Sequence, residues 1–542
     1  MKKNWFASCN ALSVALLGSC WSVQATELNI NGLSNYAASA SANSREQVTS
    51  ITQFSDVVPT DWAYQALSNL IERYGCVAGY PNGTYRGNRA MPRFEAAALL
   101  NACLDRVTEV TDELKRLMKE FEKELAILKG RVDGLEARVG ELEATQFTTT
   151  TKLEGLTTFV VGANVFGGDA NATGDQPVAN QKRANREFGA TTFNYDTQLT
   201  LNTSFTGKDN LITILRVGNF DGGKNVFGGS FLPLSTLETA FQEGDEPNII
   251  GLDRLYYSFP VGNNIVLTFG GLVGQEDMLG IWPSAYPSDA ILDVTTLNGA
   301  PGAYNKNLGA GAGVTWSANG FSATANYVAA SANISTPSKG GVGTAGAGST
   351  GTLQIGYQQE QWGLAAIYTS VQNTNQNGEP NGLMAFGTQF VLDSYNNPGT
   401  TSAFGLSGYW QPETSGWIPS ISAGWGYNAT SYDSTVLRSV DQSTLVTASQ
   451  SWTVALEWND VVLKGNNAGM AVGQPMFATE LESGDTPRDG NYIWEWWYQF
   501  QVTDNISVTP ALFYLSRPFG QETPADTTFN QLGGLVKTTF SF

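Results

Sequence analysis

The sequence predicts a mainly β protein, in which a transmembrane antiparallel β-barrel of about sixteen strands (about eighteen is the alternative) follows a small α-helical domain and a coiled-coil helix. Two observations predict the barrel. From about residue 151 to the end of the chain, apolar and polar residues alternate with a period of two. The chain also has 27 Phe, 20 Tyr and 14 Trp but only 15% charged residues, which suits a wall that faces lipid outside and water inside.

The composition bounds the functions that the chain can have. A chain of 542 residues with a net charge of −19 is too long for one ordinary domain and too acidic to be a good partner for nucleic acid. It contains no His, which excludes imidazole-based catalytic triads and His metal sites. No local pattern points to a carboxylate active site. We therefore expect no enzyme activity, no cofactor and no metal site.

Residues 1–25 have the pattern of a secretory signal peptide. Two lysines precede a short apolar core at 11–17, and small residues up to Ala25 allow cleavage there. The apolar core is shorter than the about 20 residues that a membrane helix needs. Lipidation at Cys20 is the alternative. A polar linker is expected at 26–53.

Residues 54–106 are predicted to form a compact helical domain. Apolar residues recur at helical spacing in its first half, a Gly/Pro-rich turn follows near Pro81, and a second helix begins after Pro92. The two cysteines left after removal of the signal, Cys76 and Cys103, lie in this domain. In the oxidising periplasm a disulfide is favoured, and two buried free thiols are the alternative.

This domain resembles the surface-layer homology (SLH) family, whose members bind secondary polysaccharides attached to peptidoglycan. The resemblance is carried by Phe54-Ser55-Asp56-Val57, Trp62, Ala66, Leu67, Gly79-Tyr80-Pro81-Asn82-Gly83-Thr84-Tyr85 and Arg93-Phe94-Glu95, with Pro92 where the family has a Thr. It implies a glycan site made by Trp62, Tyr80, Arg93 and Glu95, and an Arg suits the carboxylate or phosphate of an acidic glycan. The alternative places Trp62 in the core and Arg93 on the surface at a helix end.

Residues 107–147 are predicted to form one long helix with a coiled-coil seam. Its apolar positions follow each other at steps of three and four, with successive fours around Phe121; they are Val107, Val110, Leu114, Leu117, Phe121, Leu125, Leu128, Val132, Leu135, Val139 and Leu142. At about 1.5 Å per residue the seam is a rod of roughly 54 Å. Self-association would cover the seam. The alternative is a helix that folds back on the preceding domain.

The third region, residues 151–542, is predicted to be the barrel. In 193–205 one face carries Phe, Tyr, Leu and Thr, while the other carries Asn, Asp, Gln, Thr and Ser. Short turn-like connections, such as 206–210 and 503–505, alternate with long polar segments. Counting the segments gives about seventeen strands, but bacterial barrels usually have even numbers, so we predict about sixteen and place the miscount in 370–401.

The end of the chain and its overall order resemble a known family. Leu532, Val536, Phe540 and the terminal Phe542 share one face, as in the C-terminal strand that the outer-membrane assembly machinery reads. The order of signal, SLH domain, coiled coil and barrel resembles the cyanobacterial outer-membrane porins of the carbohydrate-selective, OprB-like family, also described as iron-uptake porins. The resemblance implies a homotrimer in the outer-membrane lipid, with a periplasmic domain bound to a peptidoglycan-linked polysaccharide. It also implies passive uptake of carbohydrates, other small solutes or inorganic ions.

The long segment 272–307 is the third polar loop, which porins usually fold into the lumen. Its charged residues are Glu276, Asp277, Asp289, Asp293 and Lys306. On flanking strands, Arg216 and Arg254 share the parity of polar neighbours and are expected to face the lumen. Loop acids opposite wall arginines would set a transverse field across a pore constriction. The alternative is that these acids are solvated on an external loop.

The charge balance and the aromatic residues of the third loop indicate which solutes the pore would favour. Beyond residue 150 the sequence contains 15 Lys and Arg but 32 Asp and Glu, so we expect a mild preference for cations. Trp282 and Tyr286 either stack on sugars or pack the third loop to the wall. Two other functions remain open. A structural tether with a plugged barrel would carry no current, and a secreted surface-layer protein with a soluble β-domain would need no detergent.

Overall fold

The computed structural model describes residues 50–60, 64, 68, 71, 119, 150–174, 177–221, 223–244, 246–373, 384–414, 416–433 and 441–542. The chain divides into two compact units, and the larger contains Phe147–Phe542. Within the described residues, no helix has both the length and the apolar composition needed to cross a bilayer.

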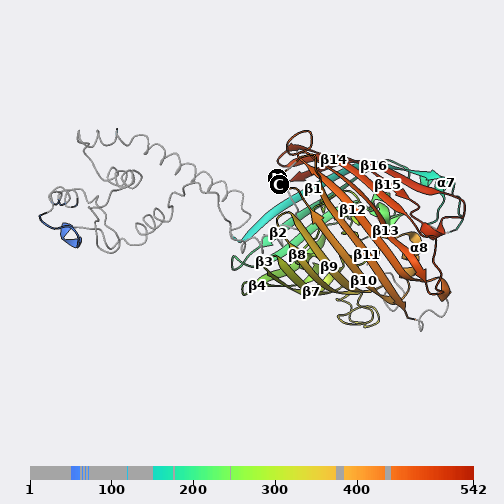
Figure 1. Cartoon of the computed structure of the whole chain (residues 1–542), viewed down its shortest axis with the longest axis horizontal. Coiled ribbons are helices and arrows are strands. Elements are labelled where there is room, and N and C mark those ends of the chain that lie inside the picture. Colours follow the sequence, from blue (N-terminus) through green and yellow to red (C-terminus); the bar gives the residue numbers. More distant parts are fainter. Residues whose placement is uncertain are drawn as a thin grey trace. The chain divides into compact units, whose positions relative to one another are not determined.

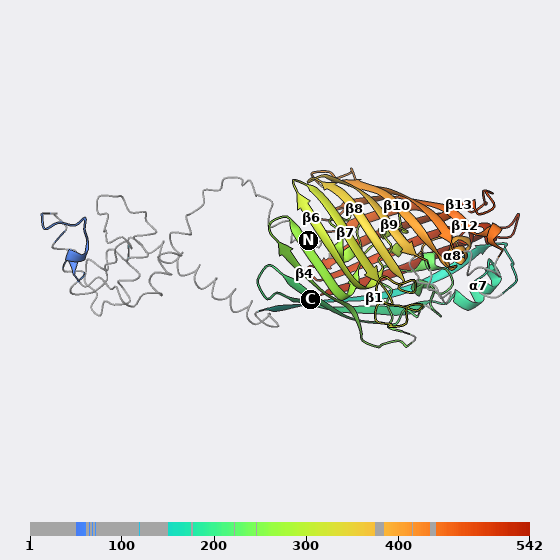
Figure 2. The same ribbon diagram turned by 90° about the horizontal axis from the view of Figure 1, so that it is seen from below.

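The larger unit contains a closed antiparallel barrel of sixteen strands (Figure 1 and Figure 2). The strands are β1 (Thr151–Gly168), β2 (Thr192–Thr203), β3 (Asn210–Gly218), β4 (Gly251–Val261), β5 (Ile265–Gly274), β6 (Leu308–Ala318), β7 (Phe321–Ala329), β8 (Ser349–Gln358), β9 (Trp362–Gln372), β10 (Gly399–Trp410), β11 (Ser420–Tyr432), β12 (Val446–Asn459), β13 (Asn467–Leu481), β14 (Tyr492–Thr503), β15 (Ile506–Ser516) and β16 (Phe529–Ser541). Each strand pairs with its neighbours in sequence, and β1 closes the ring by pairing with β16. The predicted count of sixteen is confirmed.

The connections differ at the two ends of the barrel. At the turn end, short turns join the strands; they are residues 204–209, 262–264, 319–320, 359–361, 411–419, 460–466 and 504–505. At the loop end, the long loops include L1 (169–191), L2 (219–250), L3 (275–307) and L5 (373–398). The predicted alternation of turns and loops is therefore confirmed.

Short helices occur in the long loops. The α-helices are α7 (Gln181–Phe188) in L1 and α8 (Gln389–Tyr395) in L5, and both lie at the same end of the barrel in Figure 1. The 3₁₀ helices are η2 (Val226–Gly228) and η3 (Pro233–Ser235) in L2, η4 (Glu276–Met278) and η5 (Asp293–Thr296) in L3, and η6 (Gln442–Thr444) and η7 (Gly520–Glu522) in later loops. The helix α8 explains why the period of two fails within 370–401, where the miscount was expected.

The barrel wall is apolar on its outer face and mostly polar on its inner face. Phe193 and Ile355 expose 65% and 67% of their surface outward, which is costly in water but favourable in lipid. Positions of opposite parity on the same strands, such as Asp196 and Gln354, are buried on the inner face. The predicted faces of 193–205 are confirmed.

One side of the inner wall is apolar instead. Inward side chains of β12–β16 and β1 form a cluster with L2 and L3. The wall members are Val160, Ala455, Ala471, Ile493, Trp497, Ala511, Phe513, Leu515 and Leu535, and the loop members are Phe220, Phe227, Leu234, Leu237, Tyr286, Ala290, Ile291, Leu292 and Val294. We call this side of the lumen the apolar sector. A second apolar cluster joins L3 to L5 and to strands β9, β10, β12 and β13. Hydrophobic burial therefore holds loops inside the barrel.

In the smaller unit, a 3₁₀ helix, η1 (Ile51–Gln53), begins after Ser50, whose side chain caps it. Ile51, Phe54 and Ile71 pack together, with Val57 and Tyr64 against them. Ile51 thus belongs to a folded cluster that starts before the predicted boundary at 54.

Several predictions concern residues outside those that the structure describes. They are the signal peptide at 1–25, most of the linker at 26–53 and of the coiled coil at 107–147, the glycan residues Trp62, Tyr80, Arg93 and Glu95, and the cysteines Cys76 and Cys103. These stay predictions.

Candidate pore constriction

L3 runs inside the barrel, where it is hydrogen-bonded to inward side chains of the wall. The buried amide of Gln275 donates to the carbonyl oxygen of Ala303 at 2.8 Å and to the hydroxyl of Thr352 at 2.7 Å. The amide of Gln354, inward on β8, donates to the carbonyl oxygen of Ile281 at 3.0 Å. The inward polar side chains of the wall thus supply the hydrogen bonds that a buried loop backbone requires.

A second anchor fixes L3 to β14. The Glu495 carboxylate, wholly buried, accepts hydrogen bonds from the Tyr286 hydroxyl at 2.6 Å, the Leu292 N–H at 2.7 Å and the Thr295 hydroxyl at 3.1 Å. The indole N–H of Trp497 donates to the Tyr286 hydroxyl at 2.7 Å. Within the described residues Glu495 has no ion-pair partner, so these donors stabilise its charge.

The two candidate sugar platforms have different surroundings. Tyr286 is buried and packs L3 to the wall, as one of the two alternatives expected. Trp282 is half-buried and stands edge-on to Tyr304, with ring centroids 5.1 Å apart. Neither ring is therefore a fully open stacking surface.

L2 also enters the lumen, which was not expected from the sequence. Leu237 forms a β-bridge with Leu292 of L3, and the Glu238 N–H donates to the Ile291 carbonyl at 2.9 Å. The Ser235 hydroxyl donates to the Gln531 side chain on β16 at 2.7 Å. L2 and L3 together cover the apolar sector. The apolar residues of 219–250 were a signal for this burial, but apolar residues occur in exposed loops as well.

Next to the apolar sector, on the strands that follow β1 around the barrel, charged side chains line β2–β4. Arg254 of β4 binds Asp277 and Glu276 of η4, each at 2.8 Å, and Asp253 at 3.1 Å. A register shift in the β3–β4 pairing forms a bulge at Asp253. Bulges re-aim side chains, and here Arg254, which is buried, and its neighbour Asp253, which is partly buried, both contact the charged side chains of the lumen.

Arg216 forms the second part of this charged side. It binds both carboxylate oxygens of Asp196 on β2, at 2.8 and 3.1 Å, and lies 3.9 Å from Asp253. Its guanidinium also lies 4.6 Å from the centroid of the Phe241 ring of L2. The two-pronged contact fixes the arginine's orientation as well as its charge.

Lys306 of L3 connects acids of L2 and L3 on the same charged side of the lumen. Its ammonium lies 2.7 Å from Asp293 and 3.7 Å from Glu238. Burial alone would lower the pKa of Lys306, but Asp293 and then Glu238 outweigh it and hold that pKa above its ordinary value. Burial raises the pKa of Glu238 to about 7, against the opposing pull of Lys306.

We call these nine residues the charged sector: Asp196, Arg216, Glu238, Asp253, Arg254, Glu276, Asp277, Asp293 and Lys306. Three bases meet six carboxylates, so the set has a negative excess when all are ionised. Side chains such as Arg216 and Lys306 keep 14% and 24% of their surface accessible. The charged sector therefore combines water access with fixed charge, as a pore constriction requires.

The structure brings together only part of the predicted constriction. Arg254, Glu276 and Asp277 meet, but in direct ion pairs, so at this point there is no open gap for the expected transverse field. Arg216 pairs with wall acids instead of loop acids. Asp289 lies apart from them, 4.0 Å from Lys537 of β16, while Asp293 pairs with Lys306.

Asp253 and Glu238 are members of the charged sector that sequence reasoning missed for identifiable reasons. Asp253 has the parity of the lipid face, and only the bulge turns it inward. Glu238 lies in L2, whose entry into the lumen depends on tertiary packing. No group of three or more His, Cys, Asp and Glu in the described part of the chain is arranged to hold a metal ion.

Two protein families match parts of this chain, and two proteins are similar to nearly all of it. Residues 109–274 match the family described as "Carbohydrate-selective porin, OprB family", and residues 53–97 match the "S-layer homology domain". An uncharacterized protein of Nostoc sp. is 34% identical over 95% of this chain and 88% of its own length. An uncharacterized protein of Synechocystis sp. is 30% identical over 93% of both chains.

Two further similarities are partial or distant. Outer membrane protein SlpA of Deinococcus radiodurans is 35% identical over 19% of this chain and 9% of its own length. The structure of Pseudomonas putida OprB covers 72% of this chain and 94% of its own, with 12% identity and a TM-score of 0.45.

Proposed function

Because the chain belongs to the family of cyanobacterial outer-membrane proteins that join an SLH domain to an OprB-type porin domain, we propose that it passes small hydrophilic solutes and inorganic ions passively, with a mild preference for cations. One observation supports this above all others. The barrel is closed, apolar outside and mostly polar inside, which is the arrangement that keeps a solute hydrated while it crosses hydrocarbon.

The cation preference is supported by the charged sector. Its negative excess adds to that of the whole barrel region, and a wall of that sign enriches cations and repels anions nearby. The permeating path is proposed to run along β2–β4, because Arg216 and Lys306 there keep part of their surface accessible, whereas the side chains of the apolar sector are covered. Carbohydrate or iron as a specific cargo stays a proposal that rests on the family alone.

The N-terminal unit is proposed to tether the barrel to the cell wall. The match of 53–97 to the SLH family supports binding of a peptidoglycan-linked polysaccharide in the periplasm. Trp62, Tyr80, Arg93 and Glu95 remain the proposed contacts. Assembly as a homotrimer through barrel and coiled coil is likewise a proposal.

A second function has one observation in its favour. L2, L3 and L5 bury apolar side chains inside the barrel, as a structural tether with a plugged lumen would. Single-channel recording in planar bilayers separates the two. A porin gives discrete conductance steps and a reversal potential that favours potassium over chloride. A protein that folds to a heat-modifiable barrel but gives no steps is a tether.

A further inference from the structure

Two turns at the turn end of the barrel carry exposed apolar side chains, which we call the apolar turn patch. Its members are Trp417 and Ile418 in the turn 411–419, with 97% and 61% of their surface exposed, and Val462 and Leu463 in the turn 460–466, with 85% and 64% exposed. Four other turns at this end contain only Gly and polar residues; they are 262–264, 319–320, 359–361 and 504–505. Exposed apolar residues that gather in one place mark a surface that binds a partner.

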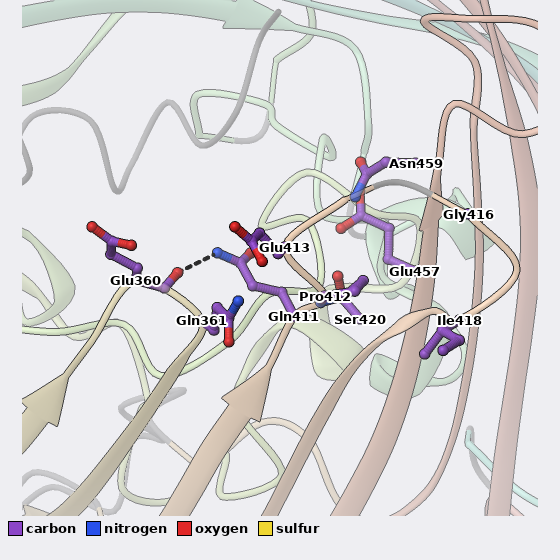
Figure 3. A pocket seen from close by; sticks show the side chains of 10 residues that line it. All are labelled: Glu360, Gln361, Gln411, Pro412, Glu413, Gly416, Ile418, Ser420, Glu457 and Asn459. Carbon is purple, nitrogen blue, oxygen red and sulfur yellow. Dashed lines mark hydrogen bonds between the residues drawn. The ribbon is translucent and has the colours of Figure 1, made fainter. Parts of the chain in front are cut away.

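The two turns lie side by side. Strands β11 and β12, which adjoin these turns, are neighbours in the barrel, and the indole N–H of Trp458 donates to the Trp417 carbonyl at 3.1 Å. The turn 411–419 is also joined to the preceding turn, because the Gln411 amide donates to the Glu360 carbonyl at 2.9 Å, the dashed bond in Figure 3. The apolar turn patch therefore occupies one region of the barrel edge.

Hydrogen bonds hold the turn 460–466 in a fixed shape. The Tyr498 hydroxyl of β14 donates to the Val461 carbonyl at 2.9 Å, and the Asn466 amide donates to the Tyr498 hydroxyl at 3.1 Å. Val462 has a φ of 65°, a left-handed conformation that a β-branched residue rarely adopts. Strained backbone of this kind gathers at functional sites. The turn thus displays an exposed valine at a position where glycine would be relaxed.

The patch continues the lipid-facing surface of the barrel. Ile421, the first outward residue of β11, and Val502, the last outward residue of β14, are both exposed. β14 reaches the turn 460–466, because the Gln501 N–H donates to the Asn466 side chain at 3.0 Å. The apolar outer wall and the turns therefore form adjoining parts of one surface, and lipid already covers the first part.

The charges around the patch are mixed. Lys464 is exposed in the turn 460–466, and its long side chain can carry the ammonium to a lipid phosphate while its stem follows the apolar residues. Glu413 and Asp460, in the same two turns, are exposed acids. Because these charges oppose each other, we expect apolar contact rather than attraction to anionic lipid to drive binding.

We propose that the apolar turn patch binds phospholipid by entering the interfacial region of one leaflet, where the glycerol groups and the first acyl carbons lie. The patch residues follow the last paired residues of their strands, so this contact extends past the band that the strands form. Trp favours the interfacial region because its ring is amphipathic. Fluid lipid surrounds protruding side chains without a complementary shape, whereas a second copy of this chain would need one. That the leaflet faces the periplasm rests on the proposed function, whereas contact with lipid does not.

The test compares the native chain with Trp417→Phe in phosphatidylcholine vesicles, with and without bromine on the acyl carbons next to the glycerol. Bromine quenches only indoles that touch it. The emission of Trp417, taken as native minus variant, should fall by roughly half or more in brominated vesicles. Trp417→Phe keeps the carbonyl that binds Trp458, and gel mobility before and after heating verifies folding. The control is Asn263→Trp in a polar turn, whose added emission should not fall.

Acrylamide, a quencher dissolved in water, separates the other outcomes. Trp417 emission that acrylamide quenches and bromine does not would show that the patch faces water. Emission that neither reagent quenches would show that protein covers the patch, either a second copy or residues 107–147. Both results overturn the proposal.

A second comparison tests whether the two turns act together. Replacing both Val462 and Leu463 by Ser should reduce the bromine quenching of Trp417 by roughly half, because the turns enter the leaflet as one surface. Phe193→Ser, which removes an exposed ring at the loop end of β2, should leave it unchanged. Equal quenching in all of these variants contradicts a joint surface. Bilayer current in a chain whose Trp417 is not quenched by bromine contradicts only the lipid contact, and quenching in a chain without current contradicts only the porin.

Discussion

The two sides of the lumen are built from opposite kinds of side chain. In the apolar sector, Phe513 and Leu515 point inward, are completely covered, and contact L2 and L3. In the charged sector, Arg216 of β3 also points inward and Lys306 belongs to L3, and both keep part of their surface accessible. A strand position that faces the lumen is therefore not necessarily in contact with water. The apolar wall determines where the loops pack, and their packing determines where water remains.

The first prediction removes a ring from the apolar sector. Phe513→Ala should lower the free energy of unfolding by about 3–5 kcal/mol, because it leaves a cavity under L2. The potassium-to-chloride permeability ratio should not change, because no charge is touched. Guanidinium unfolding in detergent, followed by tryptophan fluorescence, measures the first quantity. Leu512→Ala, on the lipid face of the same strand, is the control. An equal loss of unfolding free energy in that variant would show that packing against L2 does not add to the stability of the barrel.

The second prediction detaches L3 from its wall. Glu495→Ala leaves the Tyr286 hydroxyl, the Leu292 N–H and the Thr295 hydroxyl without their acceptor, at about 1–3 kcal/mol for each buried group. L3 should then leave the wall, and single-channel conductance should change. Glu495→Gln keeps an acceptor oxygen and should have a smaller effect. Unaltered conductance and unaltered protease resistance of L3 in the Ala variant would show that Glu495 does not anchor the loop.

The third prediction changes charge in the charged sector. Arg254→Ala leaves Glu276 and Asp277 without their cation, so the potassium-to-chloride permeability ratio should rise by roughly twofold to fivefold. Reversal potentials in a KCl gradient measure it. The same change of charge at Lys208, exposed in the turn 204–209, should have little effect. If the two variants behave alike, the selectivity comes from the general charge of the barrel.

The fourth and smallest effect is a pH dependence. Burial raises the pKa of Glu238 to about 7, so this carboxyl is neutral at pH 6 and ionised at pH 8. Ionisation adds a negative charge to the charged sector, and the potassium-to-chloride permeability ratio should increase across this range. Glu238→Gln should remove the increase. A ratio that falls with rising pH in the native chain would contradict the assignment.

The fold followed from the sequence because its period is so regular. The alternation of apolar and polar residues assigned the inner and outer faces of β2 correctly. The helix α8 interrupts this pattern, and the preference of bacterial barrels for even strand numbers still gave the correct count of sixteen. The lumen positions of Arg216 and Arg254 followed from the same parity.

The rest of the site depends on contacts between distant segments. Parity places Glu495 on the inner face, but it cannot reveal that Tyr286 and Leu292 of L3 meet it there. The bulge at Asp253 reverses a parity assignment through one extra residue. The entry of L2 into the lumen reflects apolar packing against β1, β15 and β16, which no local pattern encodes.

The most direct test asks which side of the lumen conducts. Gln198 lies inward on β2 beside Asp196, and Ala511 lies inward on β15 in the apolar sector. Each is replaced by Cys, and a positively charged methanethiosulfonate reagent is added during bilayer recording, with the native chain as background. If ions pass along the charged sector, the reagent reduces the current through Gln198→Cys and leaves the current through Ala511→Cys unchanged. Block at Ala511→Cys alone would contradict it.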